Sequence, residues 1–594
     1  MLKRTCTCGY PRKENAGETI IISGWVNTYR DQGKGLVFID LRDRFGMTQI
    51  VFDGEDSPSE VMATGTTLRR EDVITVEGIV RLRDGKPNAK LETGEIELVA
   101  QKIEVINRTA KLPILPDDHD AEEISEEHRL RYRYIDLRRP KMQKMLSLRH
   151  NITQFTRNFF ADNGFLEIET PLLITPTPEG ARDFIVPSRH QAGSWYALPQ
   201  SPQIFKQILM ISGCDKYLQI CKCLRDEDPR ADRQAEFTQI DLEMSFVEQD
   251  DILNIMSEFA TKLYKEVGGV DIGDLPRMSW KDAMDNYGSD RPDIRFDLKL
   301  TDVTKLASKT DFKVFTEAID SGGVVKAMRV GSGAEILTRK KTDGFAEIAK
   351  TYGAGGLPIV KYQGGEFATG VAKFVDPIKD ELVETLGLVD GDIVMFGVGS
   401  FRVACTSLGE VRLAVAKELD LIPDGLFRGL WVIDFPMFDW NEDAQRWISE
   451  HHPFTAPLES HLDILESDPE NCLSSGYDLV INGSELGGGS IRIHSPEVQS
   501  KVFGLLGLSD GEAEDKFGFL LNALRFGAPP HGGIAFGLDR IVMMMIGTDN
   551  IRDVIAFPKT QTGADLMCEA PGAADPSQLD ELGITMKGRP ETTS

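Results

Sequence analysis

Two arginines, Arg225 and Arg540, stand in sequence blocks whose residue types suit phosphate chemistry. One block runs from Leu224 to Asp228 and continues from Arg233 to Glu243, and the other runs from Gly532 to Arg540. A forked guanidinium can stabilise the negative charge that builds on phosphate oxygens during attack at phosphorus. Taken alone, each block could be structural, as a hairpin of exposed ion pairs or a common strand–turn–helix element. Their combination predicts a phosphate-binding site.

The segments around these blocks must place the two arginines. Strand-like segments at residues 217–224, 236–247 and 477–482 alternate with helical stretches. Helical spacing from Leu148 to Phe159 ends at Asn163–Gly164, a plausible helix stop. An apolar helix from Ile541 to Ile546 should follow Arg540. The pattern predicts a mixed α/β catalytic body.

A separate β-rich region precedes that body. Five strand-like segments, separated by Gly- and Asp-rich turns, cover residues 19–28, 36–42, 47–53, 73–82 and 94–107. This predicts a small closed barrel of the OB type, which binds oligonucleotides on one face. Phe38 could offer a stacking surface, and Arg30 lies in the turn leading to its strand. A β-barrel without a ligand remains the alternative.

Composition and linkers divide the chain further. We assign residues 1–110 to the barrel, 111–145 to a hinge, 146–285 and 425–560 to two parts of the catalytic domain, 286–424 to a Gly-rich inserted domain, and 561–594 to a C-terminal extension. The fold class is multidomain α+β. The hinge holds a basic run from Arg129 to Lys144, which could face nucleic acid or form a solvated helix face.

The composition is that of an ordinary soluble protein. The 594 residues carry a formal net charge of -27. Net charge alone is only weak evidence against a nucleic-acid partner. No apolar run is long enough to cross a bilayer and the start lacks a signal peptide, so we expect a cytoplasmic protein without a membrane partner. The eight cysteines are predicted to be reduced thiols, and no zinc is predicted, because Cys6/Cys8 and Cys221/Cys223 lack further ligands at zinc spacing.

Three blocks together resemble the class II aminoacyl-tRNA synthetases. They are Gly164–Leu173 with its Pro171, the Arg225 block and the Arg540 block. The resemblance implies a homodimer that uses ATP with Mg²⁺. It also implies that no side chain of the protein acts as a covalent nucleophile. It places Arg225 at the α-phosphate, Arg540 at the γ-phosphate, Glu227 at the adenine amino group and Phe237 against the base. The remaining implied ATP contacts are Asp226, Gln234, Glu485, Gly537, Leu538 and Asp539, and the implied metal ligands are Asp478 and Glu485.

Four further segments resemble the bacterial-type aspartyl-tRNA synthetases of subclass b. They are Thr177–Phe184, Gln200–Gln207, His451–Phe454 and Gly487–His494. L-aspartate needs anionic or carbonyl groups at its amine and cations at its side chain. We expect Glu179, Gln203 and Asp241 to bind the amine, and Arg492 and Lys206, with His451, to bind the distal carboxylate, close to Arg225. Asparagine would leave the two cations unpaired, at a cost of about 2–5 kcal/mol.

The same resemblance places Arg30, Phe38 and Gln49 on the anticodon-reading face of the barrel. It implies tRNA-Asp as a substrate. Gln32 departs from the usual residues of its loop and Gly85 leans toward relaxed specificity, so charging of tRNA-Asn stays open. The rival interpretations are an asparaginyl- or lysyl-type synthetase and a catalytically inactive paralogue that binds nucleic acid. Lys206 and Arg492 argue against the first, and the intact ATP-site residues argue against the second.

Overall fold

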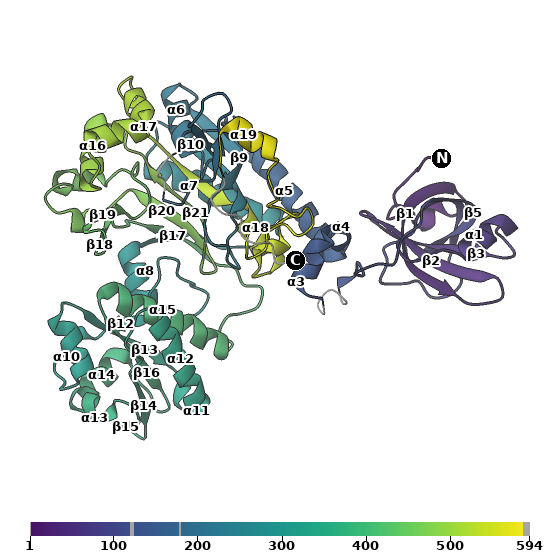
Figure 1. Ribbon diagram of the computed structural model, residues 1–594. Coiled ribbons are helices and arrows are strands. Elements are labelled where there is room, and N and C mark those ends of the chain that lie inside the picture. Colours follow the sequence, from purple (N-terminus) through teal and green to yellow (C-terminus); the bar gives the residue numbers. More distant parts are fainter. Residues whose placement is uncertain (1, 119–123, 177–179, 586–594) are drawn as a thin grey trace. The chain divides into compact units, whose positions relative to one another are not determined.

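The computed structural model describes residues 2–118, 124–176 and 180–585. It divides into two compact units, one up to residue 143 and the other from residue 144 onward, which are described separately. The first unit holds the β-barrel and the start of the hinge. The second unit holds two further sheets (Figure 1).

The N-terminal unit is a closed five-stranded barrel with the strand order β1-β2-β3-β5-β4, which confirms the predicted OB-type fold. Alternate residues of β2, including Val37, Ile39 and Leu41, point into a dry core because successive side chains of a strand face opposite ways. The elements are β1 (Thr19–Asp31), β2 (Leu36–Asp43), β3 (Gly46–Asp53), α1 (Ser59–Gly65), β4 (Val73–Leu82) and β5 (Ile96–Asn107).

Two short helices, α3 (Glu126–Arg131) and α4 (Arg133–Asp136), follow the barrel. The basic run of the hinge is partly committed to ion pairs here. Asp136 is fully buried and binds Arg133 at 2.5 Å and Arg139 at 2.7 Å. These two arginines therefore hold the hinge together, and they do not form a solvated helix face.

The catalytic body is built on an eight-stranded sheet with the order β11-β17-β20-β21-β22-β10-β9-β6. Its inner strands are antiparallel, and the outer pairs β11·β17 and β6·β9 are parallel. The strands are β6 (Leu166–Glu167), β9 (Lys216–Leu224), β10 (Glu236–Ser245), β11 (Arg277–Ser279), β17 (Gly429–Ile433), β20 (Gly476–Ile481), β21 (Ser484–Ile491) and β22 (His531–Gly537). Two small hairpins accompany it: β7 (Ile185–Pro187) with β8 (Trp195–Ala197), and β18 (Phe438–Asn441) with β19 (Arg446–Ser449).

Helices cover one face of this sheet through an aromatic cluster. Phe155, Phe159 and Phe160 of α5 contact the Phe259 ring of α7 in tilted arrangements, and Phe259 also contacts Phe536 of β22. The helices of the whole catalytic body are α5 (Pro140–Asp162), α6 (Gln203–Ile211), α7 (Gln249–Glu266), α8 (Trp280–Tyr287), α16 (Pro496–Leu505), α17 (Asp510–Leu524), α18 (Leu538–Ile546) and α19 (Pro576–Leu582). The helix expected after Arg540 already begins at Leu538, and the predicted C-terminal extension contains α19.

A five-stranded sheet, β12-β13-β16-β14-β15, interrupts the catalytic sequence. Its strands are β12 (Leu300–Asp302), β13 (Val324–Val330), β14 (Ile359–Gln363), β15 (Glu366–Ala368) and β16 (Ile393–Gly399). One hydrophobic cluster joins it to α12 (Arg339–Thr351) and α15 (Phe401–Glu418), and a second joins it to α10 (Lys313–Asp320) and α14 (Lys379–Leu386). The smaller helices here are α9 (Thr304–Ala307), α11 (Gly333–Ile336) and α13 (Ala372–Val375).

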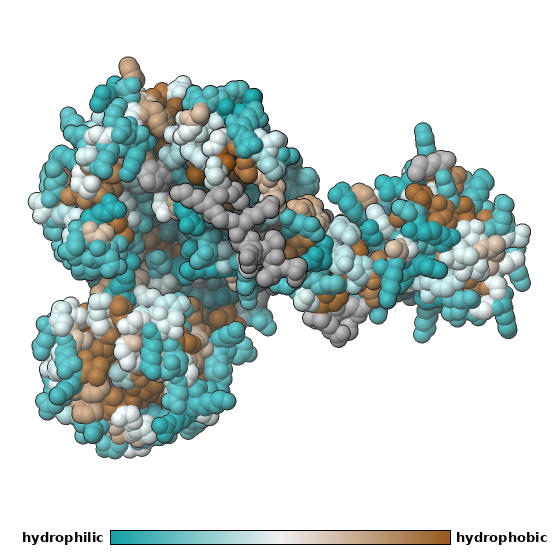
Figure 2. Space-filling view, in the orientation of Figure 1, coloured by the Kyte–Doolittle hydropathy of each residue, from teal (hydrophilic) through white to brown (hydrophobic). Residues whose placement is uncertain are grey.

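Hydrophilic residues cover much of the visible face of the protein, and apolar residues gather in patches on it (Figure 2). Among the described residues, no helix combines the length and the apolar character that crossing a membrane would require.

Candidate active site

Strand β10 carries acidic side chains on one face of the sheet. The alternation of its sequence places Gln239, Asp241 and Glu243 on that face and the buried Ile240 and Leu242 on the other. The neighbouring strand β22 contributes Gly533 opposite Glu243. A Cβ on Gly533 would lie 2.0 Å from Glu243 Oε2, so this glycine makes room for the buried carboxylate.

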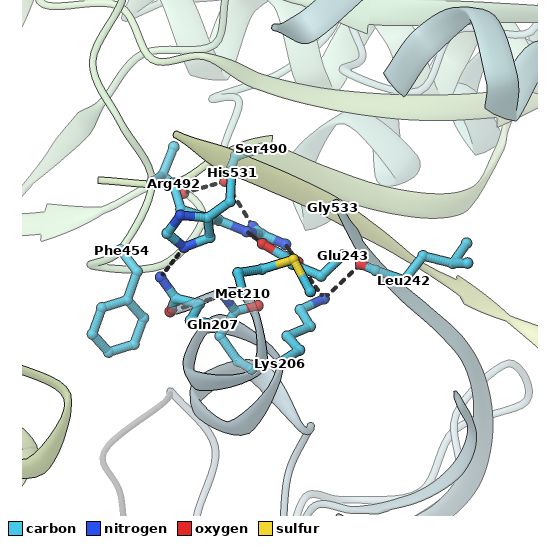
Figure 3. A network of polar contacts seen from close by, with 12 residues as sticks. Lys206, Gln207, Met210, Leu242, Glu243, Phe454, Ser490, Arg492, His531 and Gly533 are labelled. Carbon is cyan, nitrogen blue, oxygen red and sulfur yellow. Dashed lines mark hydrogen bonds and ion pairs between the residues drawn. The ribbon is translucent and has the colours of Figure 1, made fainter. Parts of the chain in front are cut away.

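Helix α6 presents Lys206 to these carboxylates (Figure 3). Gln203, Lys206, Gln207 and Met210 recur at helical spacing and are all buried. The Lys206 ammonium lies 2.7 Å from Asp241 Oδ1 and 3.3 Å from Glu243 Oε2. The lysine is thus a buried cation with two carboxylate partners.

Arg492, directly after β21, is the second buried cation of this cluster. Its Nε and Nη2 donate to the two oxygens of Glu243 at 2.9 and 3.0 Å, in a bidentate pair. Its Nη1 contacts Ser490 Oγ and His452 Nε2, both at 2.8 Å. Since a guanidinium has five N–H groups, these four contacts leave one N–H for a ligand.

The two carboxylates differ in their pKa. Burial raises the pKa of Asp241, and the Lys206 charge opposes this only in part. Burial also raises the pKa of Glu243, but Arg492 and Lys206 lower it further, and the net direction is below its ordinary value. Glu243 therefore favours its ionised form more strongly than Asp241 does. The sequence analysis treated Lys206 and Arg492 as cations whose only anionic partner is the substrate. In the structure Asp241 and Glu243 already form ion pairs with them.

The adjacent histidines have different environments. Burial, followed by the charge of Arg492, lowers the pKa of His452 well below its ordinary value, so His452 is neutral. Burial also lowers the pKa of His451, but the hydrogen bond and charge of Asp478, whose Oδ1 lies 3.6 Å from His451 Nε2, raise it further and the net direction is upward. The sequence prediction named His451 and missed His452, which contacts Arg492.

A cavity of about 400 Å³ brings these groups together. The expected aspartate-site residues Gln203, Lys206, Arg225, Asp241, His451 and Arg492 all line it. Within the described ranges, two of its buried atoms, Asp241 Oδ2 and His451 Nδ1, have no hydrogen-bond partner. An unpaired acceptor and an unpaired ring nitrogen on two residues that line one cavity suit a ligand with both an ammonium and a carboxylate. Glu179 lies outside the described residues.

A second cavity, of about 220 Å³, adjoins the first and shares Arg225, Gln239 and Glu485 with it. Arg225, Glu227, Phe237 and Arg540 line this cavity, as do Gln234, Gly537 and Asp539. The Arg225 guanidinium lies over the Phe237 ring at 5.1 Å and has no ion pair within the part of the chain that is described. Arg540 donates to the Glu485 carbonyl oxygen. Both arginines thus keep N–H groups for an anion.

Other residues expected at the ATP site are engaged within the protein. Asp226 binds Arg182 at 2.6 Å, and Gln234 Oε1 accepts from the Lys559 backbone N–H at 2.9 Å. Asp539 accepts from Arg149 and, at 2.8 Å, from the Thr238 backbone N–H. Leu538 is buried at the start of α18. These contacts hold the walls of the cavity in place.

Asp478 of β20 and Glu485 of β21 face each other across Gly488. A Cβ on Gly488 would lie 2.5 Å from Asp478 Oδ1 and 3.5 Å from Glu485 Oε1. The Asp478 charge is the largest cause that raises the pKa of Glu485, followed by burial, and Asp290 adds to the shift. Two adjacent hard oxygen donors fit Mg²⁺. The described residues contain no group of three or more His, Cys, Asp or Glu placed to hold a metal, so phosphate oxygens would complete the coordination.

The barrel has its own polar face. Arg30 Nη2 lies 3.0 Å from Gln49 Oε1 and 3.2 Å from Asp40, and Phe38 pairs with Arg30 across β1 and β2. The structure therefore brings the three expected barrel residues together. Gln49 Nε2 donates to Glu97 Oε2 at 2.8 Å. The sequence analysis did not name Glu97 as part of this polar face.

Comparison with known proteins gives a matching family model for the barrel and another for the catalytic part of the chain. A family model described as tRNA synthetases class II (D, K and N) matches residues 125–561, and one described as OB-fold nucleic acid binding domain matches residues 20–106. The chain is 49% identical over 593 residues to the "Aspartate--tRNA(Asp/Asn) ligase" of Desulfatibacillum aliphaticivorans, covering 99% of this chain and 98% of that protein. It is also 49% identical over 590 residues to the "Aspartate--tRNA ligase" of Bacillus licheniformis, covering 99% of each.

Among solved structures, the fold is similar to asparaginyl-tRNA synthetase from Pyrococcus horikoshii complexed with asparaginyl-adenylate. The TM-score is 0.59 at 19% identity, covering 94% of this chain and 99% of the other. This likeness concerns the fold alone.

Proposed function

The chain belongs to the class II tRNA synthetases (D, K and N), and we propose that it is an aspartate–tRNA ligase that activates L-aspartate with ATP and transfers it to the 3′ end of tRNA. The observation that carries the proposal is the pair of adjoining cavities that share Arg225. One is lined by the buried cations Lys206 and Arg492, and the other by Phe237 and Arg540. The carboxylate and the nucleotide that must react would meet at Arg225.

In the first cavity, the substrate ammonium would bind the free Oδ2 of Asp241 beside Gln203. The distal carboxylate would bind the remaining N–H of Arg492 and the ring of His451, whose pKa is raised by Asp478. Because Lys206 and Arg492 already have carboxylate partners, selection of aspartate over asparagine would depend on the His451 ring, whose raised pKa favours its charged form, and on the fixed direction of the Arg492 fork.

In the second cavity, adenine would stack on Phe237, with Glu227 at its amino group. The aspartate α-carboxylate attacks the α-phosphate, the bond from the α-phosphate to the bridging oxygen breaks, and pyrophosphate leaves. Arg225 would stabilise the charge on the α-phosphate oxygens and Arg540 would hold the γ-phosphate. Asp478 and Glu485 would hold Mg²⁺, which when bound neutralises the triphosphate.

A terminal ribose hydroxyl of tRNA then attacks the aspartyl carbonyl and releases AMP. The barrel face with Arg30, Phe38 and Gln49 would read the anticodon by stacking and hydrogen bonds. One relative's name specifies tRNA(Asp/Asn), whereas the other relative's name specifies no particular tRNA. Separate charging assays with the two purified tRNAs would decide the range of substrates.

A homodimer is part of the proposal. Three leucines near the edge strand β6, namely Leu166, Leu172 and Leu173, are 56%, 56% and 52% exposed. A second copy of the chain would cover them. Sedimentation of the full-length protein should give twice the chain's mass, and Leu173→Asp should shift it toward the monomer.

Aspartate-dependent exchange of labelled pyrophosphate into ATP, without tRNA, tests the first step. We expect exchange with aspartate and, because of the charge of the pocket, far less with asparagine or lysine. Exchange with asparagine in preference would favour an asparaginyl-type enzyme. No exchange with any of the three amino acids would favour a nucleic-acid-binding module without catalysis.

A further inference from the structure

A loop between α8 and β12, residues 288–298, is anchored against helix α15. Helix α8 ends at Gly288, where φ is 70°. A Cβ on Gly288 would lie 2.2 Å from the Cys405 carbonyl oxygen and 2.8 Å from Gly409 Cα. Only glycine therefore permits this close contact between the loop and α15.

Arg412 of α15 fixes the rest of the loop. Its Nη2 donates to the carbonyl oxygens of Asp293 at 2.9 Å and Phe296 at 3.1 Å, and its Nε donates to that of Leu298 at 2.6 Å. On the other side, a Cβ on Gly483 would lie 3.1 Å from Asp293 Cβ. Gly483 belongs to the turn between β20 and β21, the strands that carry Asp478 and Glu485. The loop is thus held between the inserted unit and the active-site strands.

The anchored loop displays Arg291 at its surface. Arg291 is exposed, whereas Pro292 and Asp293 beside it are buried. It lines a cavity of about 490 Å³ together with Arg295 and Arg540. This cavity shares Asp232, Glu485 and Arg540 with the proposed ATP cavity. Arg291 therefore lines a cavity that adjoins the proposed ATP cavity at Arg540, and Arg225 is not among the residues of this adjoining cavity.

Arg295 and Arg291 of this cavity differ in whether they form ion pairs with the protein. Arg295 forms a pair with Asp293 at 2.6 Å, so its charge is neutralised. Arg291 has no carboxylate within ion-pair distance among the residues the structure describes. An uncommitted guanidinium on a fixed backbone suits a multiply charged phosphate ligand, because its fork can bind two oxygens at once.

We propose that Arg291 is a further substrate-binding residue, which contacts the terminal phosphates of ATP and the departing pyrophosphate. The inference rests on the proposed function of the site. The loop would connect the inserted unit to catalysis, since α15 of that unit sets the position of Arg291. Arg291 would act beside Arg540, at the end of the triphosphate away from aspartate.

A competing role is structural. Arg291 also borders a cavity with Glu410, Glu450 and Tyr352, where its charge could stabilise the junction with the inserted unit. That role would lower the melting temperature of an Arg291 variant and would change all substrate constants together. A phosphate-binding role would change the constants for pyrophosphate and ATP alone.

The test uses full-length Arg291→Gln, Arg291→Lys and, as a matched control on the same segment, Lys299→Gln, which removes an exposed charge. Inorganic pyrophosphate is titrated into each protein by calorimetry, which needs no turnover. We expect Arg291→Gln to weaken binding about three- to tenfold, as for loss of one exposed charge-assisted contact. Arg291→Lys should restore part of the affinity, and Lys299→Gln should match the wild type.

Pyrophosphate–ATP exchange gives the second readout. We expect the KM for pyrophosphate to rise in Arg291→Gln while the KM for aspartate and the melting temperature stay unchanged. Unchanged pyrophosphate affinity, or a joint rise of all constants with a lower melting temperature, would overturn the inference. Absence of exchange in the wild type would instead defeat the proposed function, and the calorimetric comparison would still decide the role of Arg291.

Discussion

The two adjoining cavities use arginine in opposite ways. In the proposed aspartate cavity, Arg492 is 1% exposed and bonded through four contacts to Glu243, Ser490 and His452. In the proposed ATP cavity, Arg225 is half-buried and touches only the Phe237 ring among its described side-chain contacts. Arg492 is thus part of the buried core, whereas Arg225 keeps its N–H groups available for a ligand.

The difference follows from what each cation must do. A small ligand with two carboxylates can be selected only if the binding groups cannot move, and a bidentate pair with Glu243 removes the freedom of Arg492. Phosphate charge at the reacting centre changes during reaction, so Arg225 should keep its N–H groups free until then. Because the rigid site is a buried network of charges, loss of any one member should destabilise the others.

The sharpest way to break this comparison is Arg492→Leu. Removing the guanidinium takes the bidentate partner from the buried Glu243 carboxylate and leaves it only Lys206, which also pairs with Asp241. This loss should cost about 3–5 kcal/mol in stability. Steady-state exchange should show kcat/KM for aspartate falling roughly a hundred- to several-thousand-fold, with a much smaller change in the KM for ATP. Equal effects on both substrates would mean that Arg492 does not contact aspartate.

A double variant separates folding from binding. In Arg492→Leu with Glu243→Leu, no unpaired charge remains, so the melting temperature should recover while aspartate use stays lost. If the melting temperature does not recover, the pair is not the source of the instability.

Arg225→Gln sharpens the other side of the comparison. Because the guanidinium has no ion pair among the described residues, its loss should leave the melting temperature unchanged. The turnover of pyrophosphate exchange should fall roughly a hundred- to a thousandfold, as for the loss of one preorganised donor at a developing charge. Arg277→Gln is the control, since it breaks an exposed pair with Asp250 at 2.6 Å and should change neither quantity. A marked loss of stability in Arg225→Gln would contradict the distinction between the two arginines.

The sequence predicted the parts of the fold that depend on local pattern. The barrel strands follow from period-two alternation, as in Val37, Ile39 and Leu41. The same alternation in β10 could have found Glu243, which lies on the same face as Asp241. Its partner Arg492 is 249 residues away, so only the tertiary fold shows that the carboxylate is buried against a cation.

Adjacent residues of one type could not be separated from the sequence. His451 and His452 carry the same chemistry, and only the positions of Asp478 and Arg492 make one ring readily protonated and the other neutral. Asp539 shows the same limit. It was expected at ATP, and although it lines that cavity, its two oxygens bind Arg149 and the Thr238 backbone.

The smallest predicted effect concerns pH and tests whether His451 is the adjustable charge of the rigid cavity. Its pKa is raised above the ordinary value of 6.5, so the protonated ring is favoured at low pH and is lost as pH rises through the raised value. The kcat/KM for aspartate should therefore decrease as pH rises above the ordinary histidine value of 6.5, by less than roughly tenfold. His451→Gln should flatten this profile at the low value, whereas the KM for ATP should show no matching step in either protein. An unchanged profile in the variant would assign the titration to another group and leave Arg492 as the cation that selects aspartate.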